Sequence, residues 1–317
     1  MVALSARVQR LRAGNASPMT LDGTNGYLVR VGPRSVVAID PGPRDDAQRD
    51  AFLAGLRRLG SELAAILVTH GHPDHYPGAA PLHEATGAPV LAHPEAAFPH
   101  DRALADGERL KFDDASLLAL HAPGHARDHL VFVLEDERAL FTGDVVIGTG
   151  TVVVAPPAGD MRAYQDTLRR LRDLYADGAA LYGGHGPEVR KVRAKLDEYL
   201  AHREAREQQL VAALSDGPAT VPTLVTAIYR DVDRRLWPAA ARQILAYLVA
   251  LEREGRVRNE ALERAPTADE AALLNPDLSA LAASPGADVM RAELGFDVTR
   301  AELGFTVPQP FLRYRLV

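Results

Sequence analysis

Short apolar runs alternate with helical segments along the first 185 residues of the chain. The runs are rich in valine, leucine and isoleucine, which favour β-strands, and most of them end beside glycine, proline or aspartate. Between them, residues 47–60 and 161–177 space their apolar positions as an amphipathic helix does. The predicted strands are YLVRV, SVVAID, AAILVTH, APVLAH, LLALHAP, LVFVLE, ALFTGDVV and ALYGGH. Many strands with helices between them indicate a layered α/β fold.

The pattern becomes helical after residue 187. Residues 188–214 predict one long amphipathic helix, and two further helices are expected at about 222–229 and 237–254. This order of helices resembles a winged-helix module whose wing begins at residues 256–258. We therefore predict a catalytic domain at 1–187 and a helical, winged-helix-like domain at 188–317.

An apparent insertion interrupts this second domain at about 263–309. It holds a near-exact tandem repeat, RAELGFDVT followed by RAELGFTVP, but two copies are too few for a solenoid. The repeat is most simply a packing or dimer contact, so a homodimer is one expected assembly. The final FLRYRLV alternates like a strand and is predicted to return and complete the wing.

Composition excludes several classes of protein. The chain has no cysteine, so disulfides and thiolate metal sites are excluded. A net charge of −6 argues against indiscriminate binding of nucleic acid, although residues 186–258 are slightly basic. No apolar run approaches the roughly 18 residues of a membrane span. The N-terminal MVALSARVQRLRAG lacks the apolar stretch of a secretory signal and predicts an amphipathic first strand. We expect a cytoplasmic protein that binds no membrane.

One short motif carries the candidate chemistry. THGHPDH places His70, His72, Asp74 and His75 directly after the predicted strand AAILV. In a loop that leaves a strand, His70 and His72 can share one ion while Asp74 and His75 face a second. Imidazole and carboxylate suit Zn²⁺. Four ligands cannot complete two sites, so the motif predicts further histidine and aspartate downstream.

Three such residues follow, each at the end of a predicted strand. His125 stands in APGHARDH, Asp144 in FTGD and His185 in YGGHGP, and each has a glycine directly before it. Glycine lets the backbone approach an ion closely. Together with the motif, these residues are numerous enough to hold two metals that share one bridging ligand.

The order HxHxDH, GH, GD, GH resembles that of the metallo-β-lactamase superfamily. The resemblance implies an αββα sandwich with two zinc ions at one edge, without excluding manganese or iron. By resemblance, the first zinc is held by His70, His72 and His125, the second by Asp74, His75 and His185, and Asp144 bridges the two. The subclass with cysteine at the second zinc is excluded, and aspartate after the TG strand is instead the glyoxalase and phosphodiesterase pattern.

A closer resemblance covers residues 8–258. The segments PMTLDGTNGYLV, IDPGP, THGHPDH, HAPGHARDHL, FTGD, YGGHGP and HREAREQQ are similar to the endoribonuclease-type members of the superfamily, which cleave single-stranded RNA. Two departures bear on substrate access. Residues 263–309 have no counterpart in that group, and Tyr76-Pro77 replaces the small residues usual after the motif.

Other residues near the motifs are candidates to support the site. His129 is assigned to catalysis, through a contact with a ligand or with substrate. Asp40 is expected to orient the metal loop, and Thr24-Asn25 to present an amide to substrate, although a plain turn explains each nearly as well. Arg127 is more simply a solvated arginine than a phosphate contact. The remaining histidines stand outside any metal spacing and are interpreted as ordinary residues: His83, His93, His100, His121 and His202.

These residues predict a dinuclear-zinc hydrolase in which a hydroxide that bridges the metals attacks carbon or phosphorus. Asp74 and Asp144 would orient the attacking oxygen, and His129 is a candidate to protonate the leaving group. The first hypothesis for the substrate is single-stranded RNA, cleaved endonucleolytically. The second is a small thioester, ester or lactone. The third is a ligand-sensing winged-helix regulator, against which the intact set of ligands argues.

RNA as substrate would require cations near the cleft. The candidates follow the His185 loop and are therefore close to the metals in sequence: Arg190, Lys191, Arg193 and Lys195. Because their spacing does not share one helix face, only two or three could contact one strand. The acidic net charge and the lack of a basic stripe interleaved with aromatic residues favour the small ester instead.

Overall fold

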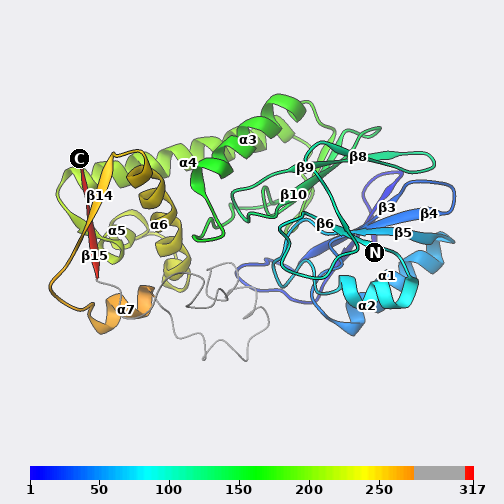
Figure 1. Cartoon of the computed structure of the whole chain (residues 1–317), viewed down its shortest axis with the longest axis horizontal. Helices are drawn as coiled ribbons and strands as arrows, with labels where there is room; N and C mark the ends of the chain where they lie inside the picture. The colour runs from blue at the N-terminus through cyan, green and yellow to red at the C-terminus, as the bar shows by residue number, and fades with distance from the viewer. Residues whose placement is uncertain (275–310) are drawn as a thin grey trace.

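The computed structural model describes residues 1–274 and 311–317 (Figure 1), so the tandem repeat lies outside the described residues. A seven-stranded sheet takes its strands in sequence order, antiparallel from β1 to β4 and parallel from β4 to β7. The strands are β1 (Val2–Ala3), β2 (Val8–Arg12), β3 (Asn25–Arg30), β4 (Ser35–Ile39), β5 (Glu62–Leu67), β6 (Val90–Ala92) and β7 (Arg102–Ala103). Helices α1 (Asp46–Leu59) and α2 (Ala79–Thr86) connect the parallel strands β4, β5 and β6.

A second sheet of five strands has the order β12-β11-β10-β9-β8. Its strands are β8 (Glu108–Lys111), β9 (Ser116–His121), β10 (Leu130–Leu134), β11 (Ala139–Gly143) and β12 (Ala180–Gly183). Helix α3 (Met161–Tyr175) connects β11 to β12, the one parallel pair in this sheet. Every strand predicted from an apolar run is present. The additional strands β7 and β8 are short, and at least half of the residues in each are polar, which explains why no apolar run marked them.

The two sheets pack face to face, and each carries helices on its outer face. Along β3, Tyr27 and Val29 face the second sheet, whereas Leu28 packs against Phe52 of α1. Along β10, Phe132 faces the first sheet while its neighbours pack beneath α3. Strands buried on both faces are apolar at successive positions, which is why they appear as continuous runs in the sequence. The predicted αββα sandwich is confirmed.

Helix α4 (Val192–Ser215) begins four residues later than the predicted start at 188. The reason is an antiparallel bridge between Leu181 of β12 and Val189, which keeps the chain extended after the His185 loop. The chain therefore runs back along β12 before the helix starts. From there α4 extends away from the sheets toward the C-terminal helices (Figure 1).

The C-terminal part is a winged helix. It contains α5 (Val221–Ile228), a 3-10 turn η1 (Arg234–Leu236), α6 (Trp237–Arg253), α7 (Ala268–Leu274) and three strands, β13 (Ala219–Thr220), β14 (Val257–Ala261) and β15 (Leu312–Leu316). Strand β15 lies between β13 and β14 and is antiparallel to both, so the predicted return of the last strand to the wing is confirmed. Among the helices of residues 1–274, none is long and apolar enough to cross a membrane.

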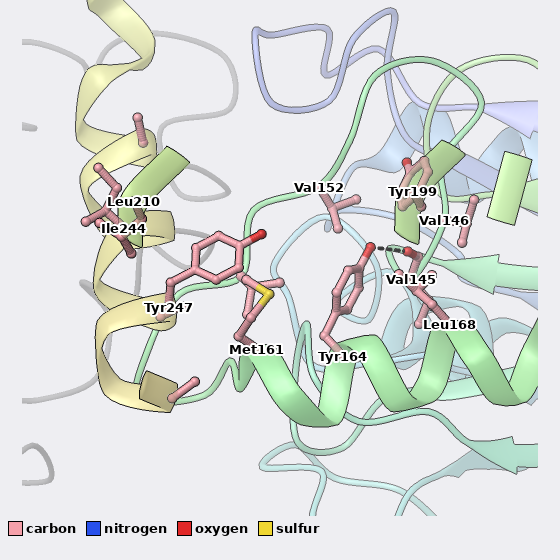
Figure 2. Packing of buried hydrophobic residues seen from close by; sticks show 14 of the residues in the cluster. Val145, Val146, Val152, Met161, Tyr164, Leu168, Tyr199, Leu210, Ile244 and Tyr247 are labelled. Carbon is pink, nitrogen blue, oxygen red and sulfur yellow. Dashed lines mark hydrogen bonds between the residues drawn. The ribbon is translucent and has the colours of Figure 1, made fainter. Parts of the chain in front are cut away.

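One hydrophobic cluster joins the second sheet to the winged helix through α3 and α4 (Figure 2). Met161 and Tyr164 of α3 lie in it together with Tyr247 of α6, and all three side chains are buried. The Tyr164 hydroxyl donates a hydrogen bond of 2.6 Å to the carbonyl of Val145. Because this core is continuous, the winged helix has a fixed position relative to the loop that follows β11.

Replacing Tyr164 with phenylalanine should lower the free energy of unfolding by about 1–2 kcal/mol, because the buried carbonyl of Val145 loses its hydrogen-bond donor. Urea denaturation measures the loss. Tyr175→Phe, at a half-buried tyrosine on the same helix, is the matched control and should cost less. Equal losses for the two variants would contradict the role given to this hydrogen bond.

Candidate metal centre

The carboxyl ends of β5, β11 and β12 meet at one edge of the sandwich, where the predicted ligands lie together. His70, Asp74 and His75 follow β5, Asp144 follows β11, and His185 follows β12. The β9–β10 turn brings His125 to the same edge, and His72 completes the set. All of these side chains are buried except that of His72, which is half-buried.

The side chains form the two trios that the sequence predicts. The ligand atoms of His70, His72 and His125 all lie within 4.8 Å of one another, and His72 Nδ1 is 3.0 Å from His125 Nε2. Asp74, His75 and His185 form the second group within the same limit.

Asp144 lies between the two trios. Its carboxylate oxygens are 3.3 Å from Nε2 of His185 and 3.5 Å from Nε2 of His75. It also forms a third group with His70 and His75, within the same 4.8 Å limit. A residue that belongs to both neighbourhoods has the position expected of a bridge.

Hydrogen bonds at Nδ1 fix how the imidazole rings face. His75 Nδ1 lies 2.8 Å from a carboxylate oxygen of Asp40, and His125 Nδ1 lies 2.9 Å from the carbonyl of Val153. His70 Nδ1 contacts the Thr69 hydroxyl at 3.0 Å. In each ring Nε2 is therefore left for the centre of the cluster, the arrangement usual for histidine ligands.

Asp40 binds the metal loop through three contacts of its carboxylate. Its carboxylate accepts from the backbone N–H of Thr69 at 2.8 Å and from the Thr69 hydroxyl at 2.7 Å, besides contacting His75. Its backbone has a φ of 48°, in the left-handed region that a residue with a side chain rarely occupies. This strained conformation directs the carboxylate at the loop, as the predicted orienting role requires.

The structure contradicts the expectation that Thr24-Asn25 presents an amide to substrate. The Asn25 amide donates to the carbonyls of Gly183 and Gly186, so it is occupied within the His185 loop and presents nothing to substrate. The Thr24 hydroxyl instead donates to Asp74 at 2.7 Å. Asn15 in turn holds Thr24 at both its hydroxyl and its backbone N–H. The sequence gives no signal for these contacts, because Thr24 and Asp74 are 50 positions apart.

His129 lies behind the cluster rather than at its open side. It is fully buried, its ring stacks on His70 at a centroid distance of 4.5 Å, and its Nε2 accepts from the backbone N–H of Asp144. Burial and the neighbouring His125 lower its pKa well below the usual value. The geometry therefore supports a role for His129 in contact with the predicted metal ligands His70 and Asp144. It does not support protonation of a leaving group by His129.

Charges in the cluster are balanced by imidazole protons. Burial raises the pKa of Asp74, but His75 and His185 overcome it and hold the pKa well below its usual range. Burial lowers the pKa of His185, yet Asp144 and Asp74 raise it to about 10. Burial, and then the neighbouring histidines, lower the pKa of His70 well below its usual value, so its ring is neutral.

The residues fit a pair of divalent cations. His70 Nε2, Asp74 Oδ1 and Asp144 Oδ1 are buried, and none of them has a hydrogen-bond partner among the described residues. Buried polar atoms without partners are rare in proteins. Ionised carboxylates converge here with imidazoles that give up their protons when a metal binds, and this is the donor set that Zn²⁺ and similar metals prefer.

A cleft of about 280 Å³ opens beside Asp144 and His185 and runs between the sandwich and the winged helix. Most of its walls are apolar. They come from the N-terminal loop, from the loop after β11, from the segment between α5 and α6, and from the start of α6, and include Met19, Leu21, Ile147, Val152, Val153, Tyr229, Val232, Leu236, Ala239 and Ala240. Three basic side chains of α4 also line it: His202, Arg203 and Arg206. The interpretation of His202 as an ordinary residue missed this position, because no metal spacing marks it.

The cations predicted to contact RNA lie elsewhere. Because Val189 pairs with Leu181, the chain leaves the metal edge, and Arg193 lies 3.7 Å from Asp177, beyond the opposite end of β12. Arg190 donates to the carbonyl of Leu4. Lys195 is buried, pairs with Glu198 and lies over the ring of Tyr199. The prediction that this cluster adjoins the metals is wrong. The residues follow the His185 loop closely in sequence, but the chain turns back along β12 and carries them away from the metal edge.

The remaining candidates have ordinary environments. Arg127 is exposed and donates to the carbonyl of Pro157, as expected of a solvated arginine. His93 stacks on His121 at 4.1 Å, outside the metal groups found among the described residues. Tyr76 stacks on Phe98 at 4.4 Å, so this departure from the usual motif forms an aromatic pair next to the metal loop.

Comparison with known families agrees with this architecture. The family model described as Metallo-beta-lactamase superfamily matches residues 19–185, a range that includes all the predicted ligands. A second model, described as Beta-lactamase associated winged helix domain, matches residues 220–264. Among solved structures, the chain resembles a metallo-beta-lactamase family protein from Thermus thermophilus, with a TM-score of 0.69, 28% identity, and coverage of 81% of this chain and 97% of that one.

Two curated relatives illustrate the range of names among similar proteins. A beta-lactamase-like protein 2 homolog of Drosophila melanogaster is 32% identical, over 80% of this chain and 91% of that protein. An atrochrysone carboxyl ACP thioesterase of Aspergillus chevalieri is 33% identical, over 80% of this chain and 86% of that protein. The first relative confirms the closer resemblance that the motifs of residues 8–258 indicated.

Metal-free protein should lose stability as pH rises. The raised pKa of His185, about 10, means that the folded metal-free chain holds a proton that the unfolded chain loses near pH 6.5. Its stabilising effect is complete below that pH and disappears as pH rises through about 10. The free energy of unfolding should therefore fall by at least about 1 kcal/mol between pH 6.5 and 9.5. Metal-loaded protein, measured in parallel by urea denaturation, is the control and should show a flatter profile; matching profiles would contradict the protonated state of His185.

Asp144→Asn should weaken metal binding and reduce turnover by at least ~10²-fold, because it removes the charge between the two trios while keeping the shape. His129→Ala should cost less, since it contacts Asp144 only through the backbone N–H. Metal content and kcat/KM are measured on both variants. Equal losses would show that the distinction between ligand and supporting residue is wrong.

Proposed function

The chain belongs to the metallo-beta-lactamase superfamily and is a hydrolase, and we propose that it cleaves the thioester of a small acyl compound, or a related ester or lactone. The observation that carries this proposal is the apolar cleft of about 280 Å³ beside Asp144 and His185. A largely apolar cleft suits an acyl group, and its volume is close to the lower end of the range found for small-molecule sites. One similar protein is named an ACP thioesterase, which is consistent with this class of substrate.

We assign two zinc ions to the centre, with manganese or iron as alternatives. When bound, they would supply Lewis acidity and lower the pKa of water toward 7. The trio of His70, His72 and His125 would hold one ion and the trio of Asp74, His75 and His185 the other. Asp144 would contribute to both. Thr24 keeps the Asp74 carboxylate in a fixed orientation through its hydrogen bond.

The leaving group provides a second line of support. A leaving group could take a proton from a carboxyl or imidazole group in the cleft. Among the described residues that line it, His202 is the one such group besides Asp144 and His185. Burial, Arg203 and Arg206 lower the pKa of His202 to about 4, so its ring is neutral at physiological pH and is too weak an acid to protonate a leaving group. A thiol, with a pKa of about 8.5, can leave as the thiolate without protonation. Alcohols are far weaker acids and depend on a proton donor. The site is therefore better suited to thioesters.

Endonucleolytic cleavage of single-stranded RNA is the second hypothesis, and it rests on the resemblance of residues 8–258 to the endoribonuclease-type members of the superfamily. It ranks below thioester hydrolysis because Arg190, Arg193 and Lys195 do not adjoin the metals. Membership in a hydrolase family argues against the third hypothesis, a ligand-sensing regulator. The homodimer and the cytoplasmic location remain predictions from the sequence.

Metal-loaded protein should hydrolyse a pentanoyl thioester of N-acetylcysteamine with a kcat/KM at least about tenfold above that of the matching oxygen ester, because the thiolate leaves more easily. Treatment with a chelator should abolish both activities. The same preparation is assayed against single-stranded RNA, a lactone and a β-lactam, with Asp144→Asn as the inactive control. Cleavage of RNA without hydrolysis of thioester would overturn the proposal in favour of the second hypothesis.

A further inference from the structure

A buried arginine forms one wall of the cleft without an acidic partner. Arg203 of α4 is only 1% exposed, yet it donates to two neutral acceptors, the carbonyl of Val152 at 2.6 Å and the Gln243 side-chain oxygen at 3.0 Å. Its guanidinium lies 5.1 Å from the ring centre of Tyr164. None of the described carboxylates forms an ion pair with it. A buried charge is expensive unless an opposite charge accompanies it.

Two donors in this wall also have no acceptor. Arg203 Nε and Gln243 Nε2 are buried and make no hydrogen bond to any described residue, although Gln243 is only 5% exposed. The two side chains come from α4 and α6, so the wall combines both helices, and each lines the cleft. A buried donor without an acceptor carries its full desolvation cost, and a ligand that brings an acceptor removes this cost.

The charge of the cleft favours an anionic ligand. Arg206 adds a second permanent cation beside Arg203, with its guanidinium over the ring of Tyr229 at 4.5 Å. Asp144 is the one acidic side chain among the described residues that line the space, and it belongs to the metal centre. Away from the metals, the cleft therefore presents apolar surface and positive charge.

We propose that Arg203, with Gln243 beside it, binds an anionic group of the substrate and makes the enzyme selective for anionic thioesters. This inference rests on the proposed thioester hydrolysis. The group is a carboxylate on the acyl part or a phosphate on the thiol part, and both match the planar fork of a guanidinium. The scissile bond would lie at the metal end, the apolar body along the cleft, and the anionic group against Arg203.

Two matched pairs of substrates test the proposal on metal-loaded, full-length protein. The first pair is the glutaryl and pentanoyl thioesters of N-acetylcysteamine, and the second is the pentanoyl thioesters of phosphopantetheine and pantetheine. In one pair the wild type should favour the charged member in kcat/KM. Arg203→Met should reduce that ratio about 10- to 100-fold, as expected when a charge-assisted hydrogen bond is lost, and Arg203→Lys should retain part of it.

Gln243→Glu distinguishes ligand binding from a purely structural role. It would give Arg203 an internal counter-ion at the same contact, so the ratio should fall although the link between α4 and α6 is kept. Arg235→Met, at an exposed arginine of η1 paired with Asp233, is the matched control and should leave the ratio unchanged. If Arg203 only links the helices, Arg203→Met would slow both members of a pair equally and Gln243→Glu would keep the wild-type ratio, which would overturn the proposal.

Loss of selectivity in the glutaryl pair assigns the site to a carboxylate, and loss in the phosphopantetheine pair assigns it to a phosphate. Either result supports the proposal, and wild-type protein that distinguishes neither pair would overturn it. If no thioester is hydrolysed, the proposed function fails, and the anion site is then tested by thermal denaturation. Glutarate should raise the Tm of metal-loaded wild type more than pentanoate does, and this difference should vanish in Arg203→Met. No difference in wild type would overturn the anion site as well.

Discussion

Burial of two carboxylates at one edge of the sandwich is the constraint on which the rest of the site depends. Asp74 and Asp144 are almost fully excluded from solvent, and isolated charges cannot remain there. The imidazoles of His75 and His185 lie within 3.5 Å of them, so the edge requires histidines on several loops at once. This requirement also fixes the backbone. A side chain at Gly184 would overlap Asp144 and His75, so only glycine lets the chain that leaves β12 pass this close to the cluster.

The winged helix contributes to the site by forming part of the cleft beside the metal centre. The segment between α5 and α6 and the start of α6 supply much of its apolar wall, while α4 supplies the cations. The core shared by Tyr164, Tyr199 and Tyr247 holds these helices against the loop after β11 (Figure 2). The metal edge belongs to the sandwich alone, whereas the space for substrate needs both domains. Differences in the winged helix can therefore change the substrate without any change in the ligands.

The sequence predicted the parts of the structure that depend on local pattern. Apolar runs marked the strands because most of them are buried on both faces, and the spacing of histidine and aspartate marked the metal edge. Polar strands such as β8 gave no such signal. Contacts between distant segments could not be predicted either: the pairing of Val189 with Leu181 moved Arg190 and Arg193 away from the metals, and Asn25 turned inward to the His185 loop. Arg203 lies in the segment HREAREQQ, but nothing in the sequence marked its burial, which depends on contacts with Val152, Gln243 and Tyr164 from other parts of the chain.

The central position of β15 in the wing has a consequence for the order of events during synthesis. Strands β13 and β14 do not pair with each other, and each pairs with β15, which comes from the last residues of the chain. During translation, the sandwich can close once α4 has emerged, but the wing stays open until the segment 275–310 and the final strand have left the ribosome. Until then β13 and β14 lack the strand with which they pair, and unpaired strand edges are prone to pair with other chains.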